Sequence, residues 1–157
     1  MKKISVILLL LFLAGSRVFS QDYVTAIGLR GGTAVGINFK YFLTISSSLE
    51  AIAATRERGY LFTGLYEFQT RAFRVRHFYW FYGGGAHAGY WRYYDGIKWV
   101  DPGEDVFVVG IDGITGLEYN IMEFPITISL DMKPALNFIG YKKPWFDTAI
   151  SLRYRIN

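Results

Sequence analysis

Residues 126–133 carry a hydrophobic pattern that recurs along the chain. Apolar and polar residues alternate there without interruption, in the order ITISLDMK. Successive side chains of a strand point to opposite faces, so one face of this strand is wholly apolar and the other carries ionised groups. The pattern predicts a strand whose polar face looks either into water or into the inside of a closed barrel.

Alternation of this kind recurs along the chain, separated by turn-forming residues. The predicted strands cover residues 23–30, 34–42, 46–55, 60–70, 78–91, 106–119, 126–133 and 146–157. Gly31 and Gly32 predict a tight hairpin after the first strand, because glycine permits positive φ. Residues 92–105 form the longest predicted connection, and residues 134–145 are predicted to connect the last two strands.

The first twenty residues have the features of a secretory signal peptide. Lys2 and Lys3 precede an apolar run over residues 4–14, and the segment 18–20 ends in the small residue Ser20 at the expected cleavage point. We therefore expect cleavage between Ser20 and Gln21, with residues 1–20 as the signal and residues 21–157 as one barrel domain. The apolar run is too short to span a bilayer core of roughly 30 Å. No cysteine is present, which excludes a lipid-anchored lipoprotein, a disulfide framework and thiol chemistry.

Charge and composition limit the classes of protein that the chain can belong to. The chain has 17 basic and 13 acidic residues, and loss of Lys2, Lys3 and Arg17 with the signal leaves 14 basic residues and a net charge near +1. No basic stripe remains, so no nucleic-acid partner is expected. Aromatic residues make up 18% of the chain, and no apolar run after residue 20 approaches the length of a transmembrane helix. A soluble all-β exported domain and a transmembrane β-barrel are the two main classes left.

The polar faces of the predicted strands favour the barrel. They carry five acids and five bases, namely Arg30, Lys40, Glu50, Glu67, Asp112, Glu118, Asp131, Lys133, Arg153 and Arg155. Turned singly toward a dry core, each charge would cost several kcal/mol, whereas opposite charges paired in one interior are tolerated. The opposite faces are aliphatic at strand centres and aromatic toward strand ends, as in lipid-facing strands. We predict an all-β fold, a closed eight-stranded antiparallel up-and-down transmembrane β-barrel, with these ten residues as a structural charge network and Arg153 and Asp131 as a coupled pair.

An even number of strands places both chain ends on one side, which an export signal makes the periplasm. The connection 92–105 then faces outside, and Tyr93, Tyr94 and Trp99 are candidate contacts for an extracellular partner. Acids also cluster in this connection, at Asp95, Asp101, Glu104 and Asp105. Their spacing does not match a calcium-binding loop, so a solvated acidic loop is expected.

No catalytic, cofactor or metal site is predicted. His87 is the histidine expected inside the barrel, but the serines cluster at residues 46–48, in a turn at the opposite end, and a nucleophile needs its base within hydrogen-bond reach. The glycines at 83–85 and at 110, 113 and 116 lack the strand–turn–helix context of a phosphate loop.

Residues 110–119, 128–134 and 152–155 resemble a family of short barrel proteins with no assigned chemistry. The chain as a whole resembles the small eight-stranded outer-membrane barrels of Gram-negative bacteria, of the kind seen in the OmpA transmembrane domain and OmpX. That resemblance implies an outer-membrane location, lipid as a partner, insertion by the barrel-assembly machinery, and a structural or surface-interaction role. The final residues, Ile156 and Asn157, depart from the aromatic end that many such barrels carry.

Two alternatives stay open at the level of sequence. One is a soluble, lipocalin-like exported barrel that binds an apolar ligand, which requires an apolar interior and a polar exterior. The other is a barrel-type lipid-modifying hydrolase, similar in fold to the lipid A deacylases.

Overall fold

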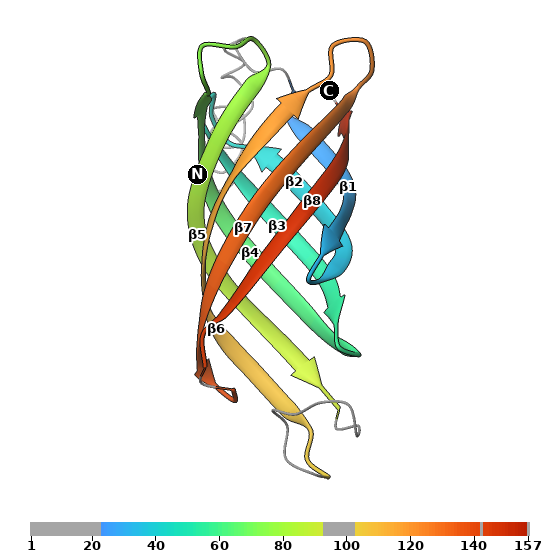
Figure 1. Ribbon diagram of the computed structural model, residues 1–157, viewed down its shortest axis with the longest axis vertical. Coiled ribbons are helices and arrows are strands. Elements are labelled where there is room, and N and C mark those ends of the chain that lie inside the picture. The colour runs from blue at the N-terminus through green and yellow to red at the C-terminus, as the bar shows by residue number, and fades with distance from the viewer. Residues whose placement is uncertain (1–22, 93–102, 142, 157) are drawn as a thin grey trace, which may run out of the picture.

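The computed structural model describes residues 23–92, 103–141 and 143–156, and these form eight strands. Each strand pairs antiparallel with the next, and β1 pairs with β8, so the sheet closes into a barrel (Figure 1). The predicted closed eight-stranded antiparallel barrel is therefore confirmed. The strands are β1 (Thr25–Gly32), β2 (Val35–Phe42), β3 (Ser47–Arg56), β4 (Gly59–Arg71), β5 (Phe78–Trp91), β6 (Val106–Asn120), β7 (Ile126–Ile139) and β8 (Trp145–Ile156).

The two ends of the barrel differ in their connections. The start of β1 and the end of β8 lie at the same end, together with the turns 43–46, 72–77 and 121–125; this is called the terminal end. The turns 33–34 and 57–58, the end of β5, the start of β6 and the end of β7 lie at the opposite end, called the loop end. The described residues contain no helix that is long and apolar enough to cross a membrane.

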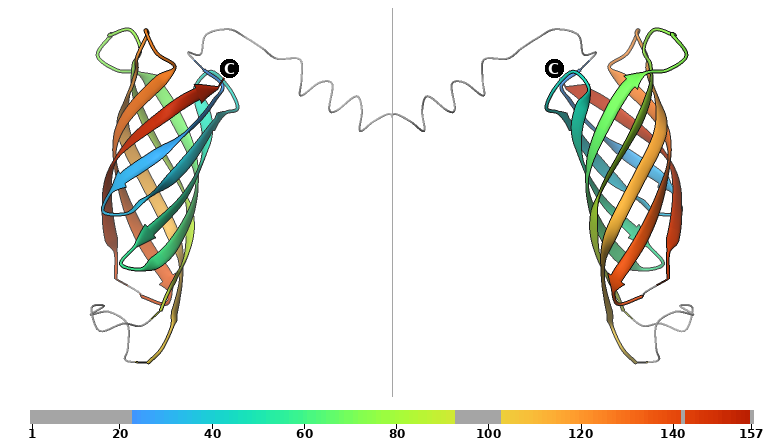
Figure 2. Two further views of the ribbon diagram at one scale, coloured as in Figure 1. Left: turned by 90° about the vertical axis from the view of Figure 1, so that its right-hand side faces the viewer. Right: turned by 90° about the vertical axis from the view of Figure 1, so that its left-hand side faces the viewer.

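The wall of the barrel has an uneven height. β1 and β2 have 8 residues each, whereas β5, β6 and β7 have 14, 15 and 14. The hairpin of β1 and β2 consequently stops well short of the tip of β5 and β6 at the loop end (Figure 2). The predicted role of the two glycines in this turn was wrong, because Gly31 and Gly32 belong to β1, neither has a positive φ, and the reversal falls at residues 33–34.

The predicted end of the seventh strand was wrong. β7 does not stop at Lys133 but continues through Pro134 to Ile139, so only residues 140–144 connect it to β8. On the β6 side the ladder lacks two pairs, between Asp112↔Ala135 and Thr115↔Met132. Both missing pairs require an N–H at position 134 that donates to the carbonyl of Gly113, and proline has none. Pro134 therefore interrupts one ladder without ending the strand, and its pairing with Phe146 on β8 is intact.

Alternation sets which side chains face the interior. β4 shows it most clearly, because buried and exposed positions alternate from Gly59 to Thr70. Not every inward position is polar. Ile52, Leu65, Phe81 and Ile114 form an apolar cluster inside the barrel with Ala34 and Ala54.

A valine at position 134 should restore the missing donor. We expect Pro134→Val to give an amide at position 134 that exchanges slowly with solvent, because it would donate to Gly113. Relative to Pro144→Val in the β7–β8 turn, which controls for the loss of a proline from the unfolded chain, the free energy of unfolding should rise by about 1 kcal/mol. Amide hydrogen exchange and urea unfolding measure both. Fast exchange of the amide at position 134 would contradict the view that the missing N–H of Pro134 causes the two missing pairs between β6 and β7.

Candidate functional site

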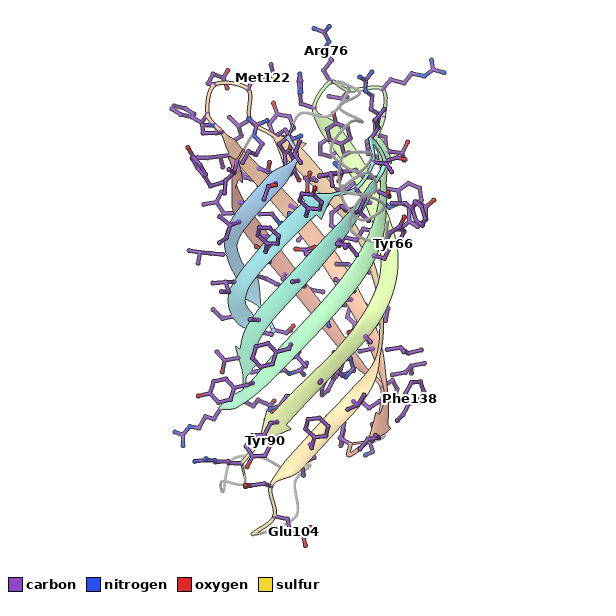
Figure 3. All side chains as sticks on the ribbon, turned by 180° about the vertical axis from the view of Figure 1, so that it is seen from behind. Tyr66, Arg76, Tyr90, Glu104, Met122 and Phe138 are labelled. Atoms are coloured by element: carbon purple, nitrogen blue, oxygen red, sulfur yellow. The ribbon has the colours of Figure 1, made fainter. Side chains whose placement is uncertain are left out.

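Ten Asp, Glu, Lys and Arg side chains of the described residues are buried inside the barrel, and the outer wall holds most of the large apolar side chains (Figure 3). In that view the labelled Tyr66, Tyr90 and Phe138 project away from the wall. The buried ionised groups form a network near the terminal end, one isolated pair, and a second network near the loop end. These groups are the candidate site.

Arg153 on β8 is the centre of the first network. Its Nη2 lies 2.6 Å from Glu50 Oε1 on β3, and its Nη1 lies 3.2 Å from Glu118 Oε2 on β6. All three side chains have no solvent exposure. The Ser129 hydroxyl accepts a further bond of 2.8 Å from Nη1. A single guanidinium thus links four strands across the interior.

Lys40 on β2 is the second cation of this network. Its Nζ lies 3.0 Å from Glu67 Oε2 and 3.2 Å from Glu118 Oε2, and it sits 4.6 Å from the centre of the Phe81 ring. Glu118 therefore bridges both cations. Its other oxygen accepts from the hydroxyl of Tyr23 at 2.7 Å.

Arg30 on β1 and Asp131 on β7 form a separate pair. Nη1 and Nη2 of Arg30 each lie 2.6 Å from one carboxylate oxygen of Asp131, which is a bidentate contact between buried groups. The predicted pairing of Asp131 with Arg153 was wrong. In the register of β7 and β8, Arg153 lies opposite Thr127, while Asp131 lies opposite Ala149, so the two side chains sit at different heights.

The second network lies toward the loop end. Asp112 on β6 accepts from Lys133 Nζ at 2.5 Å and contacts His87 Nδ1 at 2.8 Å. The other ring nitrogen of His87 lies 2.8 Å from Asn137 Oδ1. Lys133 also lies 3.5 Å from Asp147, which in turn lies 2.6 Å from Arg56 Nη1.

Nine of the ten predicted network residues lie in these groups, and Arg155 does not. It is half-buried at the end of β8 and donates to the backbone carbonyls of Ile121 and Phe124 in the β6–β7 turn, at 2.5 and 2.7 Å. Its position beyond the last inward carboxylate leaves it with backbone oxygens as acceptors. Tyr93, Tyr94, Trp99, Asp95 and Asp101 lie outside the described residues. Glu104 is exposed, and Asp105 accepts from the Tyr90 hydroxyl.

Sequence reasoning missed four members of these networks: Tyr23, Arg56, Asn137, which fell in the predicted connection 134–145, and Asp147. Asp147 could have been found, because it shares the odd-numbered face of the last strand with Ser151 and Arg153. Arg56 shares the even-numbered face of β3 with Glu50, but the predicted third strand ends at residue 55, one residue before it. Tyr23 begins the predicted first strand, where alternation places it on the outward face with Ile27 and Leu29, but it precedes β1 and is buried.

Aromatic residues close both ends of the interior. At the loop end, Trp91 is fully buried against Leu61 and Val108, packs on Trp145 with ring centres 5.7 Å apart, and donates to the carbonyl of Arg56. At the terminal end, Tyr23 and Phe42 meet edge to face at 5.0 Å. Trp91 is close in sequence to the candidate contact residues Tyr93 and Tyr94, but its own side chain is inside the barrel.

The arrangement offers little for catalysis in the described part of the chain. Both ring nitrogens of His87 are already bonded, to Asp112 and Asn137, and residues 46–48 lie at the other end of the barrel. No group of three or more His, Asp or Glu side chains among the described residues is placed to hold a metal ion.

Comparison with known proteins gives the fold. The chain is similar to the N-terminal β-barrel domain of Pseudomonas aeruginosa OprF, with a TM-score of 0.68 and 13% sequence identity, over 87% of this chain and 98% of that one. No protein-family model matches the chain, and a search of curated proteins found no match. At this identity the likeness shows a shared eight-stranded barrel and nothing about activity.

The ion-pair distances predict which buried charges depend on each other for the stability of the barrel. Arg30→Met and Asp131→Leu should each lower the free energy of unfolding by about 3–5 kcal/mol, because each leaves one buried charge unpaired. The double variant should recover most of that loss. Urea unfolding of the four proteins gives the coupling energy. The same cycle with Arg153→Met and Asp131→Leu serves as a control, and a larger coupling there would contradict the assigned pairs.

The first network has three carboxylates for two cations, so its acids should not be equivalent. Glu67 contacts one cation and Glu50 contacts the arginine that links four strands. Glu67→Gln leaves two carboxylates facing two cations, and we expect a change within about 1 kcal/mol, whereas Glu50→Gln should cost about 3 kcal/mol. Urea unfolding compares them. Equal losses would mean that net charge in this network does not matter.

Proposed function

We propose that this protein is an integral outer-membrane β-barrel whose interior is filled by polar side chains and whose role is structural or lies in surface interactions. The observation that carries the proposal is the inverted polarity of the barrel. Leu29, Leu130 and Ile150 are each more than half exposed on the outer wall, while Lys40, Glu67 and Glu118 inside have no exposure. In water this arrangement would expose apolar surface and bury charge, whereas in lipid both sets are stabilised.

The distribution of aromatic residues on the outer wall supports a bilayer as the surroundings. Trp80, Tyr82, Tyr119 and Tyr154 lie toward the terminal end, with aliphatic residues at mid-strand. Toward the loop end, Tyr60, Phe62, Tyr90, Phe107, Phe138 and Phe146 form a second girdle. Two aromatic belts around an aliphatic band are typical of lipid-facing barrels.

The filled interior supports a structural role over transport. An eight-stranded barrel is just wide enough for its own side chains to fill it. Here ion pairs link non-adjacent strands, such as β1 with β7 and β3 with β8, and aromatic residues close both ends. We infer that the network fixes the closed barrel and does not line a water channel.

The loop end is the surface we assign to the cell exterior. The start of β1 and the end of β8 lie at the terminal end, which an exported chain would leave in the periplasm. The connection 92–105, with Tyr93, Tyr94 and Trp99, remains the candidate for an extracellular partner. Membrane lipid and the barrel-assembly machinery are the other partners we propose, and the cleaved signal over residues 1–20 remains a prediction.

The same burial pattern favours this proposal over the lipocalin-like alternative. That alternative requires an apolar cavity, whereas Arg30, Glu50 and Arg153 are buried inside and most large apolar residues face outward. The hydrolase alternative lacks support, since the histidine inside the barrel is bonded on both sides by structural partners.

Two measurements test the proposal on the purified and the expressed protein. We expect the protein to stay in the membrane fraction after alkali extraction and to need detergent for release. On a detergent gel it should run as a compact form until it is boiled, because a closed barrel resists unfolding. Release by alkali alone, with one gel mobility at all temperatures, would contradict the proposal.

A further inference from the structure

The turn between β4 and β5 is the most exposed apolar and basic surface at the terminal end. Its residues 71–76, here called the arginine turn, read RAFRVR. Phe73 is 79% exposed and Val75 is 50% exposed. Arg71, Arg74 and Arg76 are exposed as well, and Arg76 projects beyond the end of the barrel (Figure 3). In the described part of the chain none of these three guanidinium groups has an ion pair or side-chain hydrogen bond.

The neighbouring turns at the same end do not share this charge. Residues 43–46 contain no ionisable side chain. Residues 121–125 expose Met122 and Phe124, at 61% and 62%, but their one ionisable group is the acid Glu123. Arg155 is occupied by the carbonyls of that turn. Positive charge is therefore concentrated on one side of the terminal end.

The backbone of the arginine turn is unusual for its sequence. Phe73 and Arg74 have φ of 51° and 55°, in the left-handed region where glycine or asparagine is the common choice. Each such residue costs about 1–2 kcal/mol relative to the ordinary helical region. Turn geometry alone would favour glycine here, whereas Phe73 and Arg74 place an exposed ring and an exposed guanidinium in this turn.

We propose that the arginine turn docks on anionic glycerophospholipid headgroups of the leaflet at the terminal end. Guanidinium groups bind phosphate in a bidentate manner, and an aromatic and a branched aliphatic side chain between them would enter the apolar boundary beneath the headgroups. Polybasic segments next to a membrane are attracted to anionic lipid over zwitterionic lipid. The proposal rests on the membrane location proposed above and adds a lipid preference on one side of the barrel.

The chain has no cysteine, so one introduced cysteine gives one labelling site. Val75→Cys and, as the matched control on the apolar acidic turn, Met122→Cys are each labelled with an environment-sensitive fluorophore. The mature chain is reconstituted into vesicles of phosphatidylcholine and phosphatidylglycerol in equal parts, with bromine on the acyl chains of one lipid or the other. Because both leaflets have the same composition, the direction of insertion does not affect the result.

We expect brominated phosphatidylglycerol to quench the label at position 75 at least about three-fold more efficiently than brominated phosphatidylcholine does. The label at position 122 should be quenched equally by the two lipids. Replacing Arg71, Arg74 and Arg76 by glutamine should remove the preference at position 75, and raising the salt to 1 M should weaken it by screening.

The outcomes separate the two proposals. Equal quenching at position 75, or a preference that survives the three glutamines, overturns the docking of anionic lipid and leaves the membrane barrel in place. Absence of quenching at both positions, by either lipid, overturns the membrane location together with the docking.

Discussion

A charge withdrawn from water needs an opposite charge or several hydrogen-bond donors within reach, and this requirement organises the interior of the barrel. Lys40, Glu118 and Arg153 are tolerable only because closure brings their strands face to face. If the sheet were opened between β1 and β8, Arg30 and Arg153 would lie on its edge strands and their partners on β7, β6 and β3 would no longer face them. Closure and ion pairing therefore stabilise each other, which suits a fold whose outer wall contributes no core of its own.

Period-two alternation was sufficient to predict the number of strands and which side of each strand faces inward. The side-chain period of a strand is a local property, so a stretch such as residues 126–133 reveals it without knowledge of its neighbours. The same property places Arg30, Glu50 and Asp131 in the interior. Alternation does not give the height of a side chain along the barrel axis, because strands tilt and stagger as a barrel closes.

The wrong predictions arise because alternation along one strand says nothing about its neighbours in the barrel. The stagger of β7 against β8 separates Asp131 from Arg153 and gives Asp131 to Arg30 instead. Pro134 suggests a strand end when one ladder is considered, yet a strand in a closed barrel has two neighbours and can lose a donor on one side while it stays paired on the other. Arg155 has inward parity but lies too near its strand end to reach a carboxylate.

In the proposed membrane setting, the unequal strand lengths have a consequence for the bilayer. A membrane next to β1 and β2 meets a much shorter apolar wall than a membrane next to β5 and β6. Such hydrophobic mismatch is relieved when the protein leans or when the lipid beside the short wall thins, at a cost of fractions of a kcal/mol per Å. In the proposed setting the barrel axis would be inclined to the membrane normal, and the thinned side would be the side on which another short-walled protein could be accommodated with the least further distortion.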